Sequence, residues 1–228
     1  MKKRLKIIII IILIISSGIL YYNLAGNVTN QTLEIKILRA VDGDTFEFEY
    51  GKVRLLGINT PEQNEQGYEE AKEFLKKYEN KIIRIEIYNT DMYGRFLAYA
   101  FSDDLINKMI LEKGLASLYY YDKDKYYNQM QKSEEIARNN NLGIWKESEN
   151  KNCIELVEFK HTEPEFLKLK NNCDFNLNLT IKDDATHIYH EVIKKNSNLQ
   201  MNFSHIFNDA GDTLFVWDDS GLVLWERY

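Results

Sequence analysis

The sequence has 228 residues, a formal net charge of −6 at pH 7, and 44% hydrophobic and 13% aromatic residues, so it can build packed cores in one or two domains. Lys and Arg minus Asp and Glu give +4 over residues 1–31, −4 over residues 32–147 and −6 over residues 148–228. This distribution excludes a basic scaffold that holds nucleic acid mainly by releasing counterions. Any contact with nucleic acid must rest on a few placed arginines and a bound cation.

The first segment, residues 1–31, is predicted to lie outside the fold. A basic head, Met1 to Lys6, precedes an apolar run over residues 7–22, which is typical of a membrane anchor or an export signal. The small residues needed for cleavage are poorly represented at residues 23–27, which favours an uncleaved anchor. A cleaved signal peptide and a soluble core helix remain alternatives. Basic residues before the run keep the N-terminus in the cytoplasm. We therefore expect a membrane-anchored protein with its globular part outside the cytoplasm, or a secreted one after cleavage.

Residues 32–147 carry the pattern of a small barrel with helices. Alternation of apolar and polar residues predicts strands at residues 45–50, 53–58, 82–88 and 95–101. Apolar residues at helical spacing predict three helices, centred on Phe74, on Met109 before a stop at Gly114, and on Met130. Strands with an inserted helix and further helices at the end are typical of a five-stranded Greek-key barrel of the OB type. The fold class is therefore mainly β with helices (α+β).

Residues 148–228 are predicted to form a second β domain. The charged stretch 145–152 lacks periodicity and is interpreted as a linker. Seven short alternating segments follow, at residues 154–160, 166–170, 177–182, 188–193, 199–203, 213–217 and 222–225. This spacing predicts an immunoglobulin-like β-sandwich. Residues 183–189 and 206–223 resemble strands of lamin-tail-type immunoglobulin-like domains, although part of that sequence pattern is common to β-hairpins in general.

Three motifs in the first domain carry the chemistry. They are Asp42-Gly43-Asp44-Thr45, then the segment from Arg54 to Glu62 that ends in Asn59-Thr60-Pro61-Glu62, then Asp91-Met92-Tyr93-Gly94-Arg95. They combine oxygen ligands for a hard cation, two guanidiniums and a carboxylate base. Alone, the first motif is equally typical of a hairpin turn. Together and in this order, the motifs resemble the staphylococcal nuclease (thermonuclease) family over about half the chain.

The resemblance implies a role for each of these side chains. Asp44 is expected to bind Ca²⁺, with Asp42 nearby or only shaping the turn. Arg54 and Arg95 are expected to grip a phosphate and stabilise its charge in the transition state. Glu62 is expected to act as the general base that takes a proton from water, or to position that water. The bland alternatives are surface arginines, and a glutamate at a helix N-terminus for Glu62.

Residue 59 departs from the family pattern, which has an aspartate two residues before the proline. Asn59 can still offer its amide oxygen to Ca²⁺, and Thr60 its backbone carbonyl, but the site loses a negative charge. We therefore expect weaker calcium binding, and we expect Asn59→Asp to strengthen it.

Two tyrosines are candidate substrate contacts. Tyr93 and Tyr120, the latter in the run Tyr119-Tyr120-Tyr121, follow the family's placement of tyrosines against the nucleotide. Tyrosine rings stack on any base without reading sequence. Filling of the core is the equally weighted alternative for each. The chain also has four histidines, but their spacing does not indicate a metal site, and no function is assigned to them.

The sequence thus predicts a Ca²⁺-dependent nuclease outside the cytoplasm, acting on DNA and RNA with little sequence preference and leaving 3′-phosphates, as the family's activity implies. The alternatives are a non-catalytic OB-type binding module for nucleic acid or protein, tethered to the membrane, and a chain whose sandwich is the main interaction module. A monomer is expected, with an unknown partner for the second domain.

Cys153 and Cys173 are predicted to form a disulfide. Segments 154–160 and 166–170 flank His161-Thr162-Glu163-Pro164-Glu165, where the chain can reverse. Antiparallel pairing about residue 163 places the two cysteines opposite each other, within disulfide reach. Two unpaired buried thiols are the alternative, because a slip of one residue turns the sulfurs to opposite faces.

Overall fold

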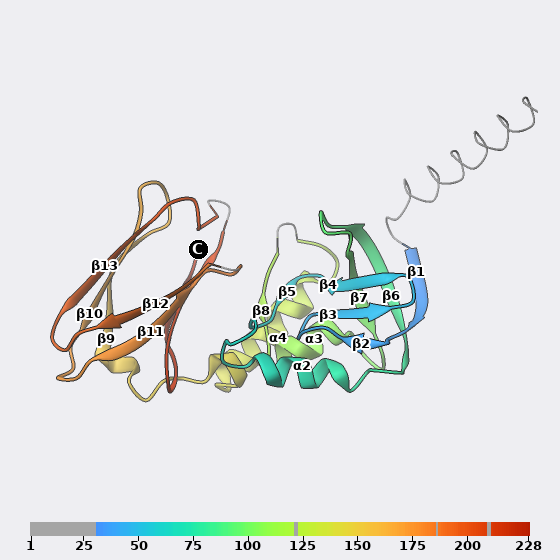
Figure 1. The fold of residues 1–228 in the computed structure, drawn as a ribbon, viewed down its shortest axis with the longest axis horizontal. Helices are drawn as coiled ribbons and strands as arrows, with labels where there is room; N and C mark the ends of the chain where they lie inside the picture. Colours follow the sequence, from blue (N-terminus) through green and yellow to red (C-terminus); the bar gives the residue numbers. More distant parts are fainter. Residues whose placement is uncertain (1–30, 121–122, 186, 209–210) are drawn as a thin grey trace, which may run out of the picture.

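The computed structural model describes residues 31–120, 123–185, 187–208 and 211–228. Figure 1 shows a barrel with its helices and a second β structure beside it, along the long axis of the molecule. The predicted anchor or signal segment lies outside the described residues. Among those residues we find no helix with the length and apolar character needed to span a membrane.

The first domain is built on one curved sheet. Its strands are β1 (Gln31–Lys36), β2 (Arg39–Ala40), β3 (Thr45–Phe48), β4 (Gly51–Leu55), β6 (Ile82–Thr90) and β7 (Phe96–Phe101), in the spatial order β1-β6-β7-β4-β3-β2. The run from β1 to β2 changes partner between two adjacent residues. The N–H of Ile37 donates to Lys81 O (3.1 Å), and that of Leu38 donates to Glu47 O (2.8 Å). One bent strand therefore joins both ends of the sheet, which closes the predicted five-stranded barrel.

Three helices cover the barrel where the sequence predicts them. They are α2 (Tyr68–Lys76), α3 (Ile106–Glu112) and α4 (Tyr127–Asn139). Alternation along β6 buries Ile83, Ile85 and Ile87 in the barrel, as a half-buried strand requires. Asn107 of α3 is fully buried, and its amide bridges Ala100 N–H (3.0 Å) and Leu56 O (2.8 Å). This polar contact fixes the start of the segment that follows β4.

The second domain is a sandwich of two sheets. Its strands are β9 (Ile154–Lys160), β10 (Glu165–Asn171), β11 (Leu177–Lys182), β12 (Ile188–Ile193), β13 (Asn198–Phe203), β14 (Thr213–Asp218) and β15 (Gly221–Arg227). They form the sheets β13-β10-β9 and β12-β11-β14-β15. Inward residues of both sheets, such as Leu167, Leu169, Leu179 and Leu214, share one apolar core. The resemblance to lamin-tail domains stays a prediction.

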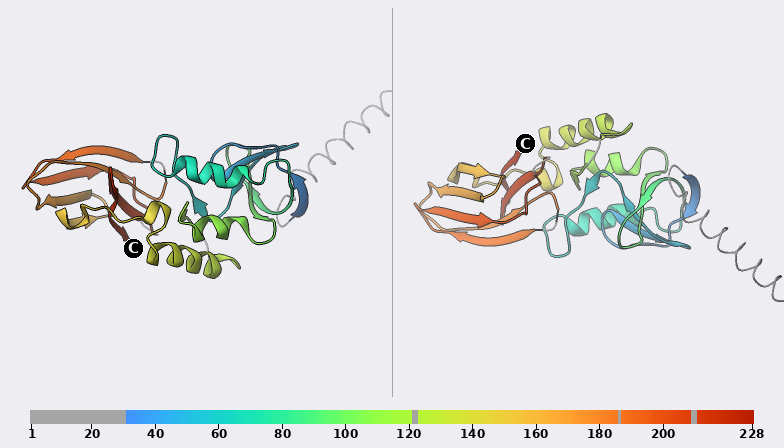
Figure 2. Two further views of the ribbon diagram at one scale, coloured as in Figure 1. Left: turned by 90° about the horizontal axis from the view of Figure 1, so that it is seen from below. Right: turned by 90° about the horizontal axis from the view of Figure 1, so that it is seen from above.

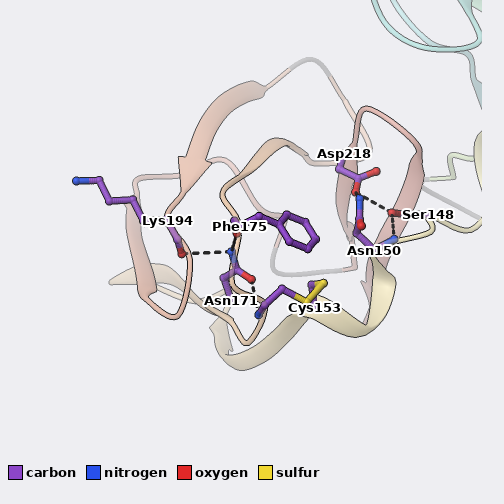
Figure 3. The surroundings of a disulfide bond; sticks show 8 residues. Ser148, Asn150, Cys153, Asn171, Phe175, Lys194 and Asp218 are labelled. Carbon is purple, nitrogen blue, oxygen red and sulfur yellow. Dashed lines mark hydrogen bonds between the residues drawn. A yellow bond between two sulfur atoms is a disulfide. The ribbon is translucent and has the colours of Figure 1, made fainter.

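Cys153 and Cys173 are joined by a disulfide, with Cα atoms 5.2 Å apart (Figure 3). The hairpin pairs about residue 163 near its turn, but a bulge at Val157 shifts the register by one. Cys153 therefore lies opposite Asn172, and the N–H of Asn172 donates to the carbonyl of Cys153 (2.8 Å). Cys173 reaches Cys153 from a bend after β10, where its N–H donates to the Asn171 side chain (2.9 Å).

The stretch 145–152, predicted as a linker, is packed against β15. Two short 3-10 turns, Gly143–Trp145 and Lys151–Cys153, flank it. Leu222 N–H donates to Lys146 O (2.7 Å), and Ser148 N–H donates to Leu222 O (2.8 Å). Asp218 accepts the hydroxyl of Ser148 (2.7 Å) and the amide of Asn150 (2.9 Å; Figure 3). Charge and missing periodicity predicted a linker, and the segment does connect the two domains, but hydrogen bonds to Asp218 and Leu222 hold it in place.

Barrel and sandwich are packed against each other at the end of the barrel that carries β5 (Ile58–Asn59) and β8 (Ser117–Leu118) (Figures 1 and 2). Trp145, Phe215 and Leu222 form part of an apolar cluster shared by the two domains. Arg227 of β15 makes two hydrogen bonds, of 2.6 and 3.0 Å, to the fully buried Glu134 of α4. Paired charges and shared apolar surface together fix the two domains relative to each other.

Candidate active site

The Asp42–Thr45 turn directs one carboxylate inward. Asp42 accepts the N–H of Asp44 (3.1 Å), and Val41 N–H donates to Thr45 O (2.8 Å), which closes the turn into β3. A Cβ on Gly43 would lie 2.6 Å from the Cβ of Ala71 and 2.8 Å from that of Thr60, so the turn needs a glycine. Asp44 is only 5% exposed. The motif is therefore a hairpin turn, as the alternative from sequence holds, and it also places the buried carboxylate of Asp44 in the site.

Asp44 binds Arg54 of β4 and Thr60 of the segment that follows β4. Its Oδ2 accepts the backbone N–H and the hydroxyl of Thr60, both at 3.1 Å, and lies 3.2 Å from the Nη1 of Arg54. Thr45 donates its hydroxyl to Oδ1 (3.1 Å). The first two sequence motifs thus meet in space, as the sequence predicts.

Arg54 is held in one orientation. It lies on β4 opposite Thr45, and its Nη1 donates to the carbonyls of Leu55 (2.8 Å) and Ile58 (2.9 Å). Its Nη2 donates to Asn59 Oδ1 (3.0 Å). These partners fix the guanidinium before any substrate arrives, which is what stabilisation of a charged transition state requires.

Asn59 also contacts the sandwich. Its Nδ2 donates to the backbone carbonyls of Asp184 (2.9 Å) and Ala185 (3.4 Å). Sequence reasoning missed these partners, because they lie 125 and 126 positions away in the chain and are backbone atoms. Nothing in the residue type at 184 or 185 signals such a contact.

Glu62 follows Pro61 and begins a turn in which the N–H of Glu65 donates to its carbonyl (2.9 Å). Helix α2 begins only at Tyr68, which excludes the alternative of a helix N-terminal acid. Partial burial and the negative charge of Asp44 raise the pKa of Glu62 above its usual value. A raised pKa suits a carboxylate that takes a proton near neutral pH. The N–H of Glu62 donates to the carboxylate of Glu65, which in turn pairs with Lys182 of the sandwich (2.8 Å).

A cation would meet oxygen donors here. Burial, and after it the negative charge of Asp44, raise the pKa of Asp42 to about 6. Among the described residues no three acids, histidines or cysteines are grouped closely enough to hold a metal by themselves. The predicted donors are one carboxylate, Asp44, and two neutral oxygens, Asn59 Oδ1 and the Thr60 carbonyl. Carboxylate, amide and carbonyl oxygens fit Ca²⁺, and their low charge predicts weak affinity.

Arg95 and Tyr93 lie at the tip before β7. The Nε of Arg95 donates to Asp91 Oδ2 (2.7 Å), and its guanidinium lies 5.5 Å from the ring centre of Tyr93. Tyr93 is 76% exposed, as a contact for substrate requires. Arg54 pairs with Leu97 of β7 in the parallel ladder, and Arg95 directly precedes β7. In this structure Arg95 is paired with Asp91 and not with Asp44.

Tyr120 packs at the edge of the barrel core. Its hydroxyl lies 2.5 Å from that of Tyr99 and donates to Asp124 (3.0 Å). Burial, with Asp124 adding to it, raises the pKa of Tyr120. A Cβ on Gly57 would lie 2.4 Å from the Tyr120 ring, so the ring covers the backbone between Arg54 and Asn59. The side chain is half-buried, which favours the packing role. Tyr121 lies outside the described residues.

A cavity of about 600 Å³ opens between the two domains beside this group. Asn59, Thr60 and Pro61 line it from the barrel, and Lys182 and Trp217 line it from the sandwich. Its volume lies in the range of ligand pockets. The space next to the candidate site is therefore shaped by both domains.

Comparison with known proteins relates the part of this site that follows the Asp42–Thr45 turn to a family. The family model described as "Staphylococcal nuclease homologue" matches residues 52–147, a range that begins after the Asp42–Thr45 turn. An uncharacterized protein of Methanocaldococcus jannaschii, MJ1439, is 34% identical over half of this chain and 72% of its own length.

Two Bacillus subtilis proteins are also similar to this chain. The SPbeta prophage-derived endonuclease YokF is 34% identical over 50% of this chain and 45% of its own length. The endonuclease YncB is 35% identical over 53% of this chain and 64% of its own length. The similarity thus spans less than two thirds of each of these two endonucleases.

Proposed function

Because the chain belongs to the family of staphylococcal nuclease homologues through residues 52–147, we propose that it is a nuclease that hydrolyses phosphodiester bonds of DNA and RNA. The observation that carries this proposal is the buried pair of Asp44 and Arg54, 3.2 Å apart, with the guanidinium locked by the carbonyls of Leu55 and Ile58. A fixed guanidinium beside a buried carboxylate suits an anionic substrate bound together with a cation.

In the proposed reaction Glu62 accepts a proton from a water molecule as the water oxygen attacks phosphorus. The new bond forms opposite the 5′ oxygen, the bond from phosphorus to that oxygen breaks, and the leaving oxygen takes a proton from solvent. The phosphate stays on the 3′ side. Arg54 and Arg95 bind the phosphate oxygens and stabilise the charge that develops on them. The side chains set no base preference in this scheme, which agrees with a sequence-tolerant enzyme.

We propose Ca²⁺ as the cofactor, held by Asp44, Asn59 and the Thr60 carbonyl. When bound, the ion supplies positive charge that polarises a phosphate oxygen. The nearby carboxylates of Asp42 and Asp44, whose like charges repel each other, support a cation at this place. Only one of the three ligands is anionic, so half-maximal binding needs a high calcium concentration.

The test is incubation of the full chain with single-stranded DNA and with RNA, with Ca²⁺ or with a chelator, followed by analysis of the new ends. We expect 3′-phosphate ends that depend on Ca²⁺. Glu62→Gln, a substitution of equal size, serves as the control for contaminating nucleases, because it removes the base and leaves the fold. Cleavage that is equal in both proteins, or 3′-hydroxyl ends, would overturn the proposal.

The alternative is a non-catalytic OB-type module that binds nucleic acid or protein. The neutral residue at position 59 favours it, because loss of an acidic ligand weakens a catalytic calcium site. Binding of single-stranded DNA without any calcium-dependent cleavage would select this alternative.

For localisation we propose the outside of the cytoplasmic membrane, through an uncleaved anchor or by secretion. The Cys153–Cys173 disulfide supports this, because such bridges persist in oxidising compartments. Fractionation of the producing cells, with blotting for the globular part, tests it: protein found only in the cytoplasm would contradict the proposal.

A further inference from the structure

The segment that carries three predicted site residues is tied to the sandwich at both ends. At its start, Asn59 donates to the Asp184 and Ala185 carbonyls. At its end, Glu65 accepts two hydrogen bonds from Lys182, of 3.0 and 2.8 Å, and also accepts the N–H of Glu62. Lys182 is only 6% exposed. A charge pair so far from water holds its geometry better than a surface pair does.

The orientation of the Asn59 amide follows from its neighbours. Arg54 can only donate, so the atom that faces it must be the amide oxygen. The carbonyls of Asp184 and Ala185 can only accept, so the atom that faces them must be the amide nitrogen. An aspartate at position 59 satisfies only the first side. On the second side it sets a carboxylate oxygen against two carbonyl oxygens.

The sandwich presents these carbonyls on a fixed turn. Asp183 accepts the N–H groups of Ala185 (3.0 Å) and His187 (3.1 Å). Asp184 N–H donates to Asp212 (2.9 Å), and the hydroxyl of Thr213 donates to the Asp184 carboxyl (2.8 Å). The turn is therefore preorganised to receive the amide of Asn59.

A second connection links the sandwich to β5, the strand that contains Asn59. The carboxylate of Glu134 that binds Arg227 also accepts the N–H of Leu118 (2.7 Å). Leu118 lies on β8, which pairs with β5, the strand that contains Asn59. The sandwich thus contacts the side chain of Asn59 directly, and it is linked to β8, the partner of the strand that contains Asn59, through Glu134.

We propose that the sandwich is a positioning element of the candidate site, and that residue 59 is an amide because it must serve Arg54 and the sandwich at once. The sandwich holds the oxygen of Asn59 toward Arg54 and the cation position, as an outer partner orients a metal ligand. Loss of such partners typically lowers metal affinity about 10–100-fold. The proposal rests on the proposed function for the identity of the cation, and its tests do not depend on nuclease activity.

The first test is Asn59→Asp in the full chain, with Ca²⁺ affinity measured by calorimetry. If residue 59 acts only as a Ca²⁺ ligand, the negative charge of the aspartate strengthens Ca²⁺ binding, as the sequence analysis expects. With the sandwich as the positioning element, the variant loses both hydrogen bonds to the sandwich, so its Ca²⁺ affinity falls. Stronger Ca²⁺ binding in Asn59→Asp would overturn the proposal.

The second test weakens docking without touching Asn59. Lys182→Met removes a lysine that pairs across the domain boundary, and Lys168→Met removes one that pairs with Glu158 (2.7 Å) inside the sandwich. We expect Lys182→Met to bind Ca²⁺ about 10–100-fold more weakly and to exchange the Asn59 side-chain hydrogens faster. The matched control, Lys168→Met, should match the parent protein in both measurements.

If Lys182→Met does not fold, Arg227→Lys loosens the docking at Glu134 while keeping the charge. Unchanged Ca²⁺ affinity and unchanged exchange of the Asn59 amide in a folded docking variant would overturn the proposal. If the parent protein binds no Ca²⁺ at all, the proposed cofactor is wrong. The exchange of the Asn59 hydrogens then still decides whether the sandwich holds this side chain.

Discussion

Buried acids serve different purposes in the two domains. In the sandwich, Asp183 accepts N–H groups from residues two and four positions further along the chain, and so shapes the backbone that follows it. In the barrel, Asp44 binds Thr60, 16 positions away, and an arginine from another strand. A buried acid that satisfies its own turn is a structural device. One that faces a guanidinium from a different element either joins two parts of the molecule, as Glu134 does with Arg227, or lies in the candidate site, as Asp44 does with Arg54.

The largest effect on activity should come from a substitution beside Asp44 in the barrel. Arg54→Ala removes the guanidinium beside Asp44, and loss of a fixed donor to transition-state charge typically lowers kcat by about 10²–10³. Steady-state cleavage of single-stranded DNA measures it. Arg84→Ala is the matched control, because Arg84 is a barrel arginine paired with Glu86 (2.6 Å) outside the site. Equal activity of the two variants would remove Arg54 from the mechanism.

Arg95 is expected to follow with a loss of about 10²-fold in kcat for Arg95→Ala. Its guanidinium is bound to Asp91 and must turn to reach a phosphate. Arg95→Lys keeps the charge but loses the planar fork, so its activity should fall between the parent and the alanine variant. If Arg95→Lys and Arg95→Ala were equally active, the charge of Arg95 would have no role.

The sandwich side is tested by its disulfide. Replacing Cys153 and Cys173 by serine opens a loop of 20 residues, and should lower the free energy of unfolding by about 3 kcal/mol on the chain-entropy model. Urea unfolding measures it, with activity of the folded variant as the control, because the bridge lies in the sandwich. Mass spectrometry of exported protein that finds both thiols alkylated without a reductant would contradict the bridge itself.

The smallest effect concerns pH. Burial raises the pKa of Asp184 to about 7, although Arg227 opposes the shift. A carboxyl with a pKa higher in the folded than in the unfolded state contributes stability that is complete below about pH 4. This contribution is lost as pH rises toward 7. Asp184→Asn should therefore be more stable than the parent at pH 8 and equal to it at pH 4. Parallel stability curves from pH 4 to 8 would contradict the assignment.

Local patterns predicted most of the fold. Strands such as β9, β11 and β12 begin and end at the predicted residues, because alternation and turn residues are encoded within a few positions. The barrel, the three helices and the meeting of Asp44 with Arg54 also followed from the sequence and the family resemblance. The bulge at Val157 did not, because an extra residue leaves an ordinary alternating pattern on either side.

Long-range contacts made by backbone atoms could not be predicted. The groups that bind Asn59 are backbone carbonyls, which every residue has, so the residue types at these positions do not indicate the contact. The segment 145–152 was interpreted as a linker for the same reason. Its partner, Leu222, binds it through backbone groups over 70 positions away. Sequence patterns describe what a segment can form, and packing decides which distant segment it meets.

The contact between Arg227 and Glu134 has a consequence for biosynthesis. The ribosome delivers Glu134 together with Arg138, whose Nε lies 3.8 Å from its carboxylate one helical turn on, whereas Arg227, which makes the closer contact, follows 93 residues after Glu134. Until β15 has been synthesised, the carboxylate of Glu134 lacks the hydrogen bonds of its partner in the sandwich. We therefore expect the docking of the two domains to be a late step in the maturation of the chain.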